Sequence, residues 1–219
     1  MVVKECIMCY IKCNQSVQKR KREVRRLELF WCDLRGLESY SPSRPGRSAA
    51  PGSGWAWSLL AYAVCAVWGC DLPEAGTLPG GKPVFPSRPE ICFSLSHTKT
   101  AVLAAVSEHP VGADVEWRRP VRPALEKRLF SLPHGDLDVF ELWTLRESWF
   151  KLTGEGSLLS IPFSRENGVI TGPAPELKCR VYDEIPASCA AVCSLSETPS
   201  KKILRIASEE IMLEKPSGL

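Results

Sequence analysis

The stretch ELWTLRESWFKLTGEG, residues 141–156, constrains the fold most strongly because its periodicity is that of one helix with two unlike faces. At about one hundred degrees per residue, four apolar side chains form a single stripe: Leu142, Leu145, Trp149 and Leu152. Glu147 and Lys151, four residues apart, lie together on the opposite side and are flanked by Trp143 and Phe150. An acid and a base beside aromatic side chains indicate a functional site rather than a solvated face.

Composition limits the class of protein. Of the 219 residues, 44% are apolar and 24% are charged, which suits a soluble globular chain of one or two domains. The net charge of +3 gives no reason to expect nucleic acid, and it suits a phosphorylated ligand or an acidic protein partner. The longest apolar run, residues 55–68, is too short to span a bilayer, so we expect no membrane partner.

Ten cysteines are scattered along the chain. Charged residues interrupt the first twelve positions, so no signal-peptide pattern is visible, and we expect reduced thiols and a cytoplasmic location. The spacing of Cys6, Cys9 and Cys13 leaves an iron–sulfur or zinc site open as an alternative, although no fourth cysteine follows at a suitable distance.

The first hundred residues mix strand, loop and helix signals. Residues 2–12 read as a strand, and the basic run 19–26 reads either as a solvated helix face or as a phosphate-binding edge. A Pro/Gly/Ser-rich loop over 41–54 precedes a buried helix over 55–68, with Ser53 as its N-cap and Gly69 just beyond its end.

From residue 91 onward, strands dominate. Residues 100–117 read as a hairpin whose return strand carries Asp114 and Glu116 on one face and Val115 on the other. A short helix, ALEKRLFSL, follows, and the segments after Gly156 read as an antiparallel meander of short strands. These signals predict an α+β protein, and a weak internal echo of a Trp-rich helix ending in glycine suggests two similar halves.

Three carboxylates, Asp114, Glu116 and Glu147, are the candidate centre of a site. Clustered carboxylates repel one another unless a cation neutralises them, and Mg²⁺ prefers oxygen ligands and substrate phosphates. Lys151, one turn from Glu147, would stabilise charge on the same phosphates. The alternative is a solvated strand face and an ordinary i,i+4 ion pair.

Four blocks occur in the order found in one enzyme family: GKP (81–83), FSLSHT (93–98), VGADVEW (111–117) and LWTLRESWFKLTGEG (142–156). With these blocks, and with a similar tail over 181–212, the chain resembles the Sfp-type 4′-phosphopantetheinyl transferases across residues 80–215. The resemblance implies a pseudo-twofold pair of α+β halves with antiparallel sheets packed against helices, which we divide at 1–106 and 107–219. The nucleotide of coenzyme A would lie toward the first half.

The resemblance also implies an activity. Members of this family use Mg²⁺ to transfer the phosphopantetheine arm of coenzyme A to a serine of an apo acyl or peptidyl carrier protein, releasing 3′,5′-ADP. Asp114, Glu116 and Glu147 match the metal ligands of the family, and Glu147 also matches its general base. Lys151 matches the lysine that assists the leaving group. The matching coenzyme A contacts are Arg20, Arg47, Ser48, Gly81, Lys82, Pro83, Ser96 and His97.

The chain departs from the family pattern at Arg146, where many members carry lysine, and at Glu23, where members offer a phosphate-binding lysine. Pro51 also predicts an interruption of the helix that follows the GRS segment. The resemblance implies carrier docking over 118–140. The candidate residues there are Leu125, Leu129, Phe130 and Leu132, with Arg118, Arg119, Arg122, Lys127 and Arg128 suited to an acidic carrier.

Two similar halves in one chain favour a monomer. A non-catalytic protein that binds coenzyme A or a carrier is the second functional hypothesis, and the divergent N-terminal region is what supports it. The class of carrier, from fatty acid, polyketide or non-ribosomal peptide synthesis, stays open at this stage.

Overall fold

The computed structural model describes residues 27–37 and 51–212. Several sequence-based predictions lie outside these residues. They are the strand over 2–12, the basic run 19–26 with Arg20 and Glu23, the cysteines at 6, 9 and 13, and the nucleotide contacts Arg47 and Ser48.

Two antiparallel sheets form the centre of the molecule. The first has the strand order β11-β1-β5-β4, in which only the β11–β1 pair is parallel. Its strands are β1 (Glu28–Asp33), β4 (Cys92–His97), β5 (Ala101–Ser107) and β11 (Leu204–Ile206). The second sheet has the order β6-β10-β9 and is wholly antiparallel. Its strands are β6 (Val111–Trp117), β9 (Lys178–Tyr182) and β10 (Ser188–Ser194).

Two small hairpins and a set of helices complete the fold. The hairpins pair β2 (Gly76–Thr77) with β3 (Pro83–Val84), and β7 (Ser164–Glu166) with β8 (Val169–Thr171). The helices are α2 (Pro51–Trp68), α3 (Pro123–Leu129), α4 (Val139–Thr153), the 3-10 turn η1 (Leu158–Ser160) and α5 (Ser208–Ile211). Across residues 27–37 and 51–212, no helix combines the length and the apolar character needed to cross a membrane.

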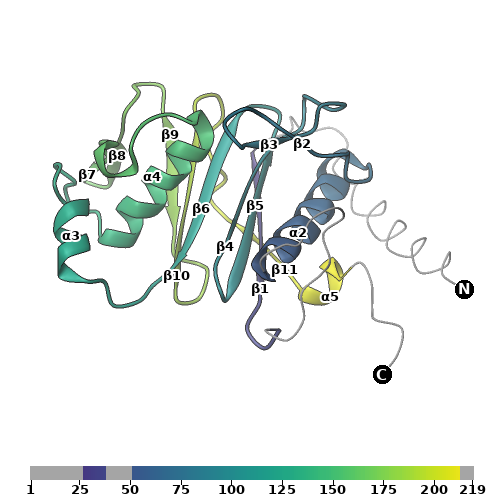
Figure 1. The fold of residues 1–219 in the computed structure, drawn as a ribbon, viewed down its shortest axis with the longest axis horizontal. Helices are drawn as coiled ribbons and strands as arrows, with labels where there is room; N and C mark the ends of the chain where they lie inside the picture. The colour runs from purple at the N-terminus through teal and green to yellow at the C-terminus, as the bar shows by residue number, and fades with distance from the viewer. Residues whose placement is uncertain (1–26, 38–50, 213–219) are drawn as a thin grey trace, which may run out of the picture.

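Three buried cores define a layered arrangement of α2, the first sheet, the second sheet and α4 (Figure 1). Strand β5 explains how the layers hold together. Val102 and Val106 belong to the core under α2, whereas Leu103 belongs to the core between the two sheets. Because successive side chains of a strand point to opposite faces, a strand buried on both sides must be apolar at nearly every position. The run AVLAAVS therefore lies at the centre of the molecule.

The predicted helix over 55–68 is confirmed, but it starts earlier than expected. Helix α2 begins at Pro51, so Ser53 lies inside the helix and is not its N-cap, and Pro51 does not interrupt the helix. Proline is tolerated in the first turn because the amide it lacks has no intrahelical partner there. The predicted end is confirmed, since Gly69 has a φ of 66° and its amide donates to the Cys65 carbonyl oxygen.

The predicted hairpin over 100–117 is wrong. Strand β5 pairs with β1 and β4, whereas β6 pairs with β10 in the other sheet. The short turn between Ser107 and Val111 therefore carries the chain from one sheet to the other. Two apolar strands joined by a tight turn give the same sequence pattern in either arrangement, because packed sheets and paired strands both bury apolar faces.

The predicted C-terminal meander is correct only in part. Strands β9 and β10 pair as neighbours, but β11 leaves the second sheet and lies parallel to β1 in the first. The residues that follow form α5, which packs on α2. The α+β class is confirmed, and β11 and α5, the last elements of the described residues, return to the first sheet and to α2.

Gly112 on β6 sets the distance between the second sheet and α4. A Cβ atom added at this position would lie 1.9 Å from the Ser148 carbonyl oxygen and 2.6 Å from the Leu152 amide nitrogen. Both are backbone atoms of α4, so rotation of a side chain cannot relieve the overlap. Only glycine allows β6 and α4 to approach this closely.

We therefore expect Gly112→Ala to lower the free energy of unfolding by roughly 2–3 kcal/mol, since overpacking against backbone forces the helix away from the sheet. Urea unfolding followed by circular dichroism measures the change. Gly80→Ala is the matched control, because a Cβ at Gly80 meets no atom within 4 Å. Equal stability of the two variants would contradict the assigned packing.

Candidate functional site

The candidate site lies at the seam where strand β4 of the first sheet meets strand β6 of the second. The Ser94 hydroxyl accepts a hydrogen bond from the Ala113 amide at 2.9 Å and lies 3.4 Å from the Ala113 carbonyl oxygen, to which it is a donor. A side chain therefore joins these two strands where no backbone ladder runs between them. Helix α4 packs over β6 on the other side.

Asp114 and Lys151 form the central ion pair of this seam. The Asp114 side chain is only 6% exposed, and its Oδ1 atom lies 2.7 Å from Lys151 Nζ. The Ser96 hydroxyl donates to the same Oδ1 atom, also at 2.7 Å, and Lys151 Nζ donates to the Leu95 carbonyl oxygen at 3.4 Å. The other carboxylate oxygen, Asp114 Oδ2, is buried without a hydrogen-bond partner. Lys151 thus bonds to a carboxylate from β6.

Glu147 and Glu116 complete the acidic group. Burial, followed by the negative charge of Asp114, raises the pKa of the Glu147 carboxyl. The Lys151 ammonium lowers this pKa and Glu116 raises it further, so the other three groups all lie within electrostatic range of Glu147. Glu116 itself pairs with Arg119 Nη1 at 3.0 Å. The carboxylates predicted from separate segments therefore gather on facing sides of β6 and α4.

The acids do not form a closed metal cage. Within the part of the chain that the structure describes, no three His, Cys, Asp or Glu side chains are already arranged to hold a metal ion. Two of the acids are instead paired with cations, Asp114 with Lys151 and Glu116 with Arg119. Among these acids, Asp114 Oδ2 is a buried oxygen without a hydrogen-bond partner.

Ser96 and His97, predicted together as phosphate contacts, point in different directions because neighbouring residues of a strand face opposite sides. Ser96 is buried against Asp114, whereas His97 is exposed beside the first turn of α2. A Cβ atom at Gly52 would lie 2.0 Å from His97 Cδ2. Partial desolvation of the imidazole, helped by the Lys151 ammonium, lowers the pKa of His97, although Asp114 acts in the opposite direction.

Lys82, predicted as a nucleotide contact, joins the β2–β3 hairpin to β6 and α4. Its Nζ atom donates to the Val111 carbonyl oxygen at 3.3 Å and to the Leu152 carbonyl oxygen at 3.2 Å. Leu152 lies in the last turn of α4, where carbonyl groups lack intrahelical partners and a cation is favourable. Burial lowers the pKa of Lys82. Gly81 and Pro83 flank it at the turn that joins β2 to β3.

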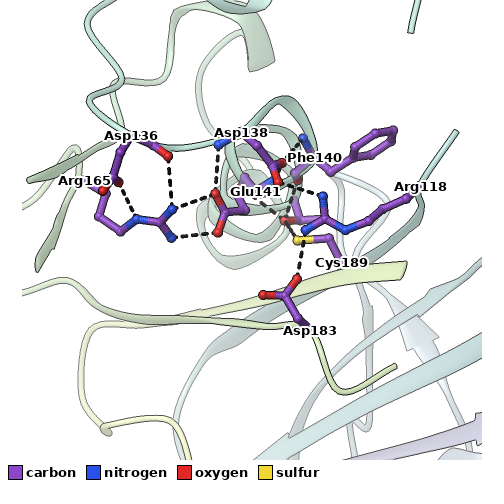
Figure 2. Close-up of polar contacts among 9 residues, drawn as sticks. Arg118, Asp136, Asp138, Phe140, Glu141, Arg165, Asp183 and Cys189 are labelled. Carbon is purple, nitrogen blue, oxygen red and sulfur yellow. Dashed lines mark hydrogen bonds and ion pairs between the residues drawn. The ribbon is translucent and has the colours of Figure 1, made fainter. Parts of the chain in front are cut away.

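The other end of α4 is held by a network that Figure 2 shows. Asp138 caps the helix by accepting from the Phe140 and Glu141 amides, and the Glu141 carboxylate accepts from the Asp138 amide in return. Arg165 binds the buried Glu141 carboxylate through two nitrogens, at 2.6 and 2.9 Å. The D-x-x-E pattern before an apolar run is the sequence signal of this capping box, but Arg165 has no such signal.

Arg118 extends this network toward the second sheet. Its guanidinium binds Asp138 at 2.7 Å and Asp183 at 2.8 Å. Burial opposes ionisation of Asp138, but hydrogen bonds from the Glu141 amide and from Arg118 outweigh it and lower the pKa of the Asp138 carboxyl. The Arg118 guanidinium therefore forms ion pairs within the fold. The Arg119 guanidinium likewise pairs with Glu116.

Some residues of the predicted docking segment 118–140 are exposed, and others belong to the core. Leu129 is buried in the core under α4, so it is not a surface residue. Leu125 and Phe130 are partly buried against the same core, and Phe130 stacks on His134. The basic side chains that remain exposed along α3 and its start are Arg122, Lys127 and Arg128.

Comparison with known proteins finds several curated proteins to which this chain is similar. It is 28% identical to the 4′-phosphopantetheinyl transferase Sfp of Bacillus subtilis strain 168, over 60% of this chain and 67% of Sfp. It is 30% identical to the 4′-phosphopantetheinyl transferase psf-1 of Bacillus pumilus, over 60% of this chain and 65% of that protein. The chain is a relative of the Sfp-type 4′-phosphopantetheinyl transferases. These matches bear out the resemblance that the motifs carry, and they support the prediction of an enzyme.

The chain spans about two thirds of the length of these curated Sfp-type relatives. It is also 32% identical to the uncharacterized protein YieE of Escherichia coli strain K12, over 68% of this chain and 66% of YieE. No protein-family model matches the chain.

Arg146, where the Sfp-type pattern often has lysine, is fully buried in α4. Its Nε atom donates to the Ile161 carbonyl oxygen at 2.8 Å, and Nη1 donates to the Leu129 carbonyl oxygen at 2.9 Å. A lysine has a single nitrogen and cannot reproduce this fork. Burial lowers the pKa of Arg146. The side chain joins α4 to the end of α3 and to the loop after η1.

We expect Arg165→Met to lower the free energy of unfolding by about 2–3 kcal/mol, because it leaves the buried Glu141 carboxylate without its cation. Chemical unfolding measures the loss. The double variant Arg165→Met with Glu141→Met removes both charges and should recover part of the stability. A single variant as stable as the parent would contradict a structural role for the pair.

We expect Lys82→Met to lower the free energy of unfolding by about 1–2 kcal/mol, because two buried carbonyl groups lose their donor while the alkyl chain is kept. Thermal unfolding without ligand provides the measurement, and Lys99→Met, on an exposed lysine, is the control. Unchanged stability together with weaker coenzyme A binding would instead favour the nucleotide contact.

Proposed function

We propose that this chain transfers 4′-phosphopantetheine from coenzyme A to a serine hydroxyl of an apo acyl or peptidyl carrier protein. The products are the holo carrier and 3′,5′-ADP, and the reaction depends on Mg²⁺. The observation that carries the proposal is the meeting of Asp114, Glu116, Glu147 and Lys151 between β6 and α4. The names of the relatives support the same chemistry.

The acids suit a hard cation. The three side chains offer only oxygen donors, Asp114 Oδ2 is buried without a partner, and burial followed by neighbouring negative charge raises the pKa of Glu147. We propose that Asp114, Glu116 and Glu147 hold Mg²⁺, with Glu116 exchanging its bond to Arg119. When bound there, Mg²⁺ offsets negative charge on the pyrophosphate of coenzyme A.

We assign the proton transfer to Glu147 and the stabilisation of the leaving group to Lys151. The Glu147 carboxylate accepts the proton of the carrier serine, directly or through a water, so that the serine oxygen attacks the β-phosphorus of the pyrophosphate. The bond from phosphorus to the 3′,5′-ADP oxygen breaks, and the Lys151 ammonium offsets charge on that leaving oxygen. Lys151 already lies in this group of acids, with its Nζ atom 2.7 Å from Asp114 Oδ1.

We propose that the nucleotide end of coenzyme A lies toward α2. His97 borders the first turn of that helix, whose amides favour an anion. Arg47 and Ser48 precede α2 in the chain, and with Arg20 they keep their proposed role as nucleotide contacts. At the β2–β3 turn, we keep Gly81, Lys82 and Pro83 as proposed nucleotide contacts. For Lys82 this role is in addition to its hydrogen bonds to the Val111 and Leu152 carbonyl oxygens.

The fold supports the proposed pseudo-twofold relation of the two halves. The first half runs β1, α2, β4, β5 with the sheet order β1-β5-β4, and the second runs β6, α4, β9, β10 with the order β6-β10-β9. The same succession and the same strand order recur. We propose the division at 1–106 and 107–219 on this basis, with β11 and α5 returning to the first half.

We further propose a cytoplasmic monomer that serves an acidic carrier. The exposed side chains of Arg122, Lys127 and Arg128 on and before α3 give this surface a positive charge. Gel filtration with light scattering checks the monomer.

The deciding experiment incubates the protein with Mg²⁺, coenzyme A and a panel of apo carriers from fatty acid, polyketide and non-ribosomal peptide synthesis. Mass spectrometry should detect a phosphopantetheine adduct. We expect Glu147→Gln to slow transfer by about a hundredfold or more, because the amide cannot accept the proton. Glu155→Gln, an exposed acid beyond α4, is the matched control and should keep full activity.

Absence of an adduct on every carrier would overturn the proposed activity. Binding of coenzyme A without turnover, unchanged by Glu147→Gln, would favour the non-catalytic binding protein instead. Chelation of Mg²⁺ should abolish transfer and readdition should restore it. Transfer that persists in chelator would contradict the dependence on the metal.

A further inference from the structure

We propose that Gly52, in the first turn of α2, positions the His97 imidazole for the 3′-phosphate of coenzyme A. Gly52 is a positioning residue in this proposal, because it acts through His97 and does not itself bind the phosphate. The inference rests on the proposed function, in which the nucleotide end of coenzyme A lies beside His97 and α2. None of the four sequence blocks that carry the family resemblance includes Gly52.

The His97 ring lies directly against the backbone of α2 at Gly52. A Cβ atom added at Gly52 would lie 2.0 Å from His97 Cδ2, 2.9 Å from its Cγ and 3.0 Å from its Nε2. Carbon atoms in contact are normally about 3.5–4.0 Å apart. The ring therefore occupies the space that a side chain at position 52 would need, and the two cannot both stay in place.

Strand pairing fixes the backbone of His97, so its side chain is the part that can move. His97 pairs with Val102 across β4 and β5. The Thr98 amide donates to the Ala101 carbonyl oxygen at 2.8 Å, and Thr98 Oγ1 accepts from the Thr100 and Ala101 amides, each at 3.1 Å. These bonds close the turn that follows β4. The position of the imidazole thus depends on what its ring packs against.

Helix α2 is fixed in place as well, since it packs along β4 and β5 (Figure 1). Trp57 meets Phe93 of β4 edge-on, with ring centroids 5.8 Å apart, and Trp55 and Leu59 are buried in the core beneath the helix. The first turn cannot retreat from β4 without disturbing that close-packed core. A side chain at position 52 would therefore displace the imidazole, which lies at an exposed strand end, and not the helix.

The start of α2 suits the anion that His97 is proposed to meet. The amides of the first helical turn have no intrahelical acceptors, and this end of a helix carries partial positive charge. An imidazole held against Gly52 can donate to an anion that these amides also face. We therefore expect recognition of the 3′-phosphate to depend on where Gly52 lets the ring lie.

Gly52 and Gly112 both allow a close approach, but the atoms that they approach differ. Gly112 faces backbone atoms of α4, so an alanine there forces two elements apart. Gly52 faces ring atoms of a side chain, so an alanine there moves the ring and leaves the backbone in place. Alanine also favours a helix more than glycine does. Gly52→Ala should therefore be at least as stable as the parent, which circular dichroism during urea unfolding checks.

NMR spectroscopy tests the packing without any ligand. The chain has three histidines, so the imidazole signals are few, and His97→Ala identifies those of His97. We expect Gly52→Ala to shift the His97 ring signals and to leave those of His109 and His134 unchanged. Gly80→Ala is the matched control, since a Cβ atom there meets no atom within 4 Å, and it should shift none of them. Unshifted His97 signals in Gly52→Ala would overturn the proposal.

Isothermal calorimetry then gives the ratio of affinities for coenzyme A and 3′-dephospho-coenzyme A, with no carrier present. We expect Gly52→Ala to lower the preference for coenzyme A about tenfold, because one hydrogen bond to a charged group is lost. His97→Ala should lower it as much, and the double variant should lose no more than His97→Ala alone. Gly80→Ala should keep the preference of the parent.

A parent-like preference in Gly52→Ala would contradict the positioning role. A further loss in the double variant would also overturn it, since Gly52 would then act on the helix and not through His97. The carrier panel decides the proposed transfer separately. A parent that prefers coenzyme A to the dephospho form but modifies no carrier loses the proposed function and keeps this role of Gly52. A parent without that preference overturns the role of Gly52, whether or not it modifies a carrier.

Discussion

The close contact between α4 and β6 is the constraint on which the candidate site depends. Gly112 lets the backbone of the helix lie directly on the strand, and Asp114 follows two residues later on the same face. The Lys151 ammonium can then reach the Asp114 carboxylate at 2.7 Å. A wider separation would remove this bond and would move Glu147 away from the other acids. Packing against one glycine thus sets the electrostatics of the whole group.

Buried charge around α4 is compensated locally, and the compensation differs between its ends and its middle. At the N-terminus, Arg165 satisfies Glu141 with two bonds, so that pair is complete. Lys82 meets the carbonyl groups at the C-terminus. In the middle, Asp114 keeps an oxygen without a partner and the pKa of Glu147 is raised. The ends are closed structural contacts, whereas the centre retains negative charge that no such contact balances.

Local patterns predicted the elements well where a single face decides the structure. The stripe of Leu142, Leu145 and Leu152 is the buried face of α4, and Asp114 lies opposite Val115 on β6, as alternation requires. The pairing of strands was harder. The hairpin over 100–117 was wrong, because burial on both faces removes the alternation that would show which neighbour a strand has. Likewise, Leu129 looked like a docking residue but is a core residue.

The sequence by itself determined the kinds of groups in the site, the helix that carries Glu147 and Lys151, and the family to which the motifs point, because these depend on residue identity and short spacing. Only the tertiary structure decided which groups each of these side chains contacts. Ser96 and His97 are adjacent in the chain, yet one holds Asp114 and the other borders α2, and Lys82 reaches carbonyl groups 29 and 70 residues away. Such contacts form where sheets and helices meet, and no local pattern encodes the distance between segments that are far apart in the chain.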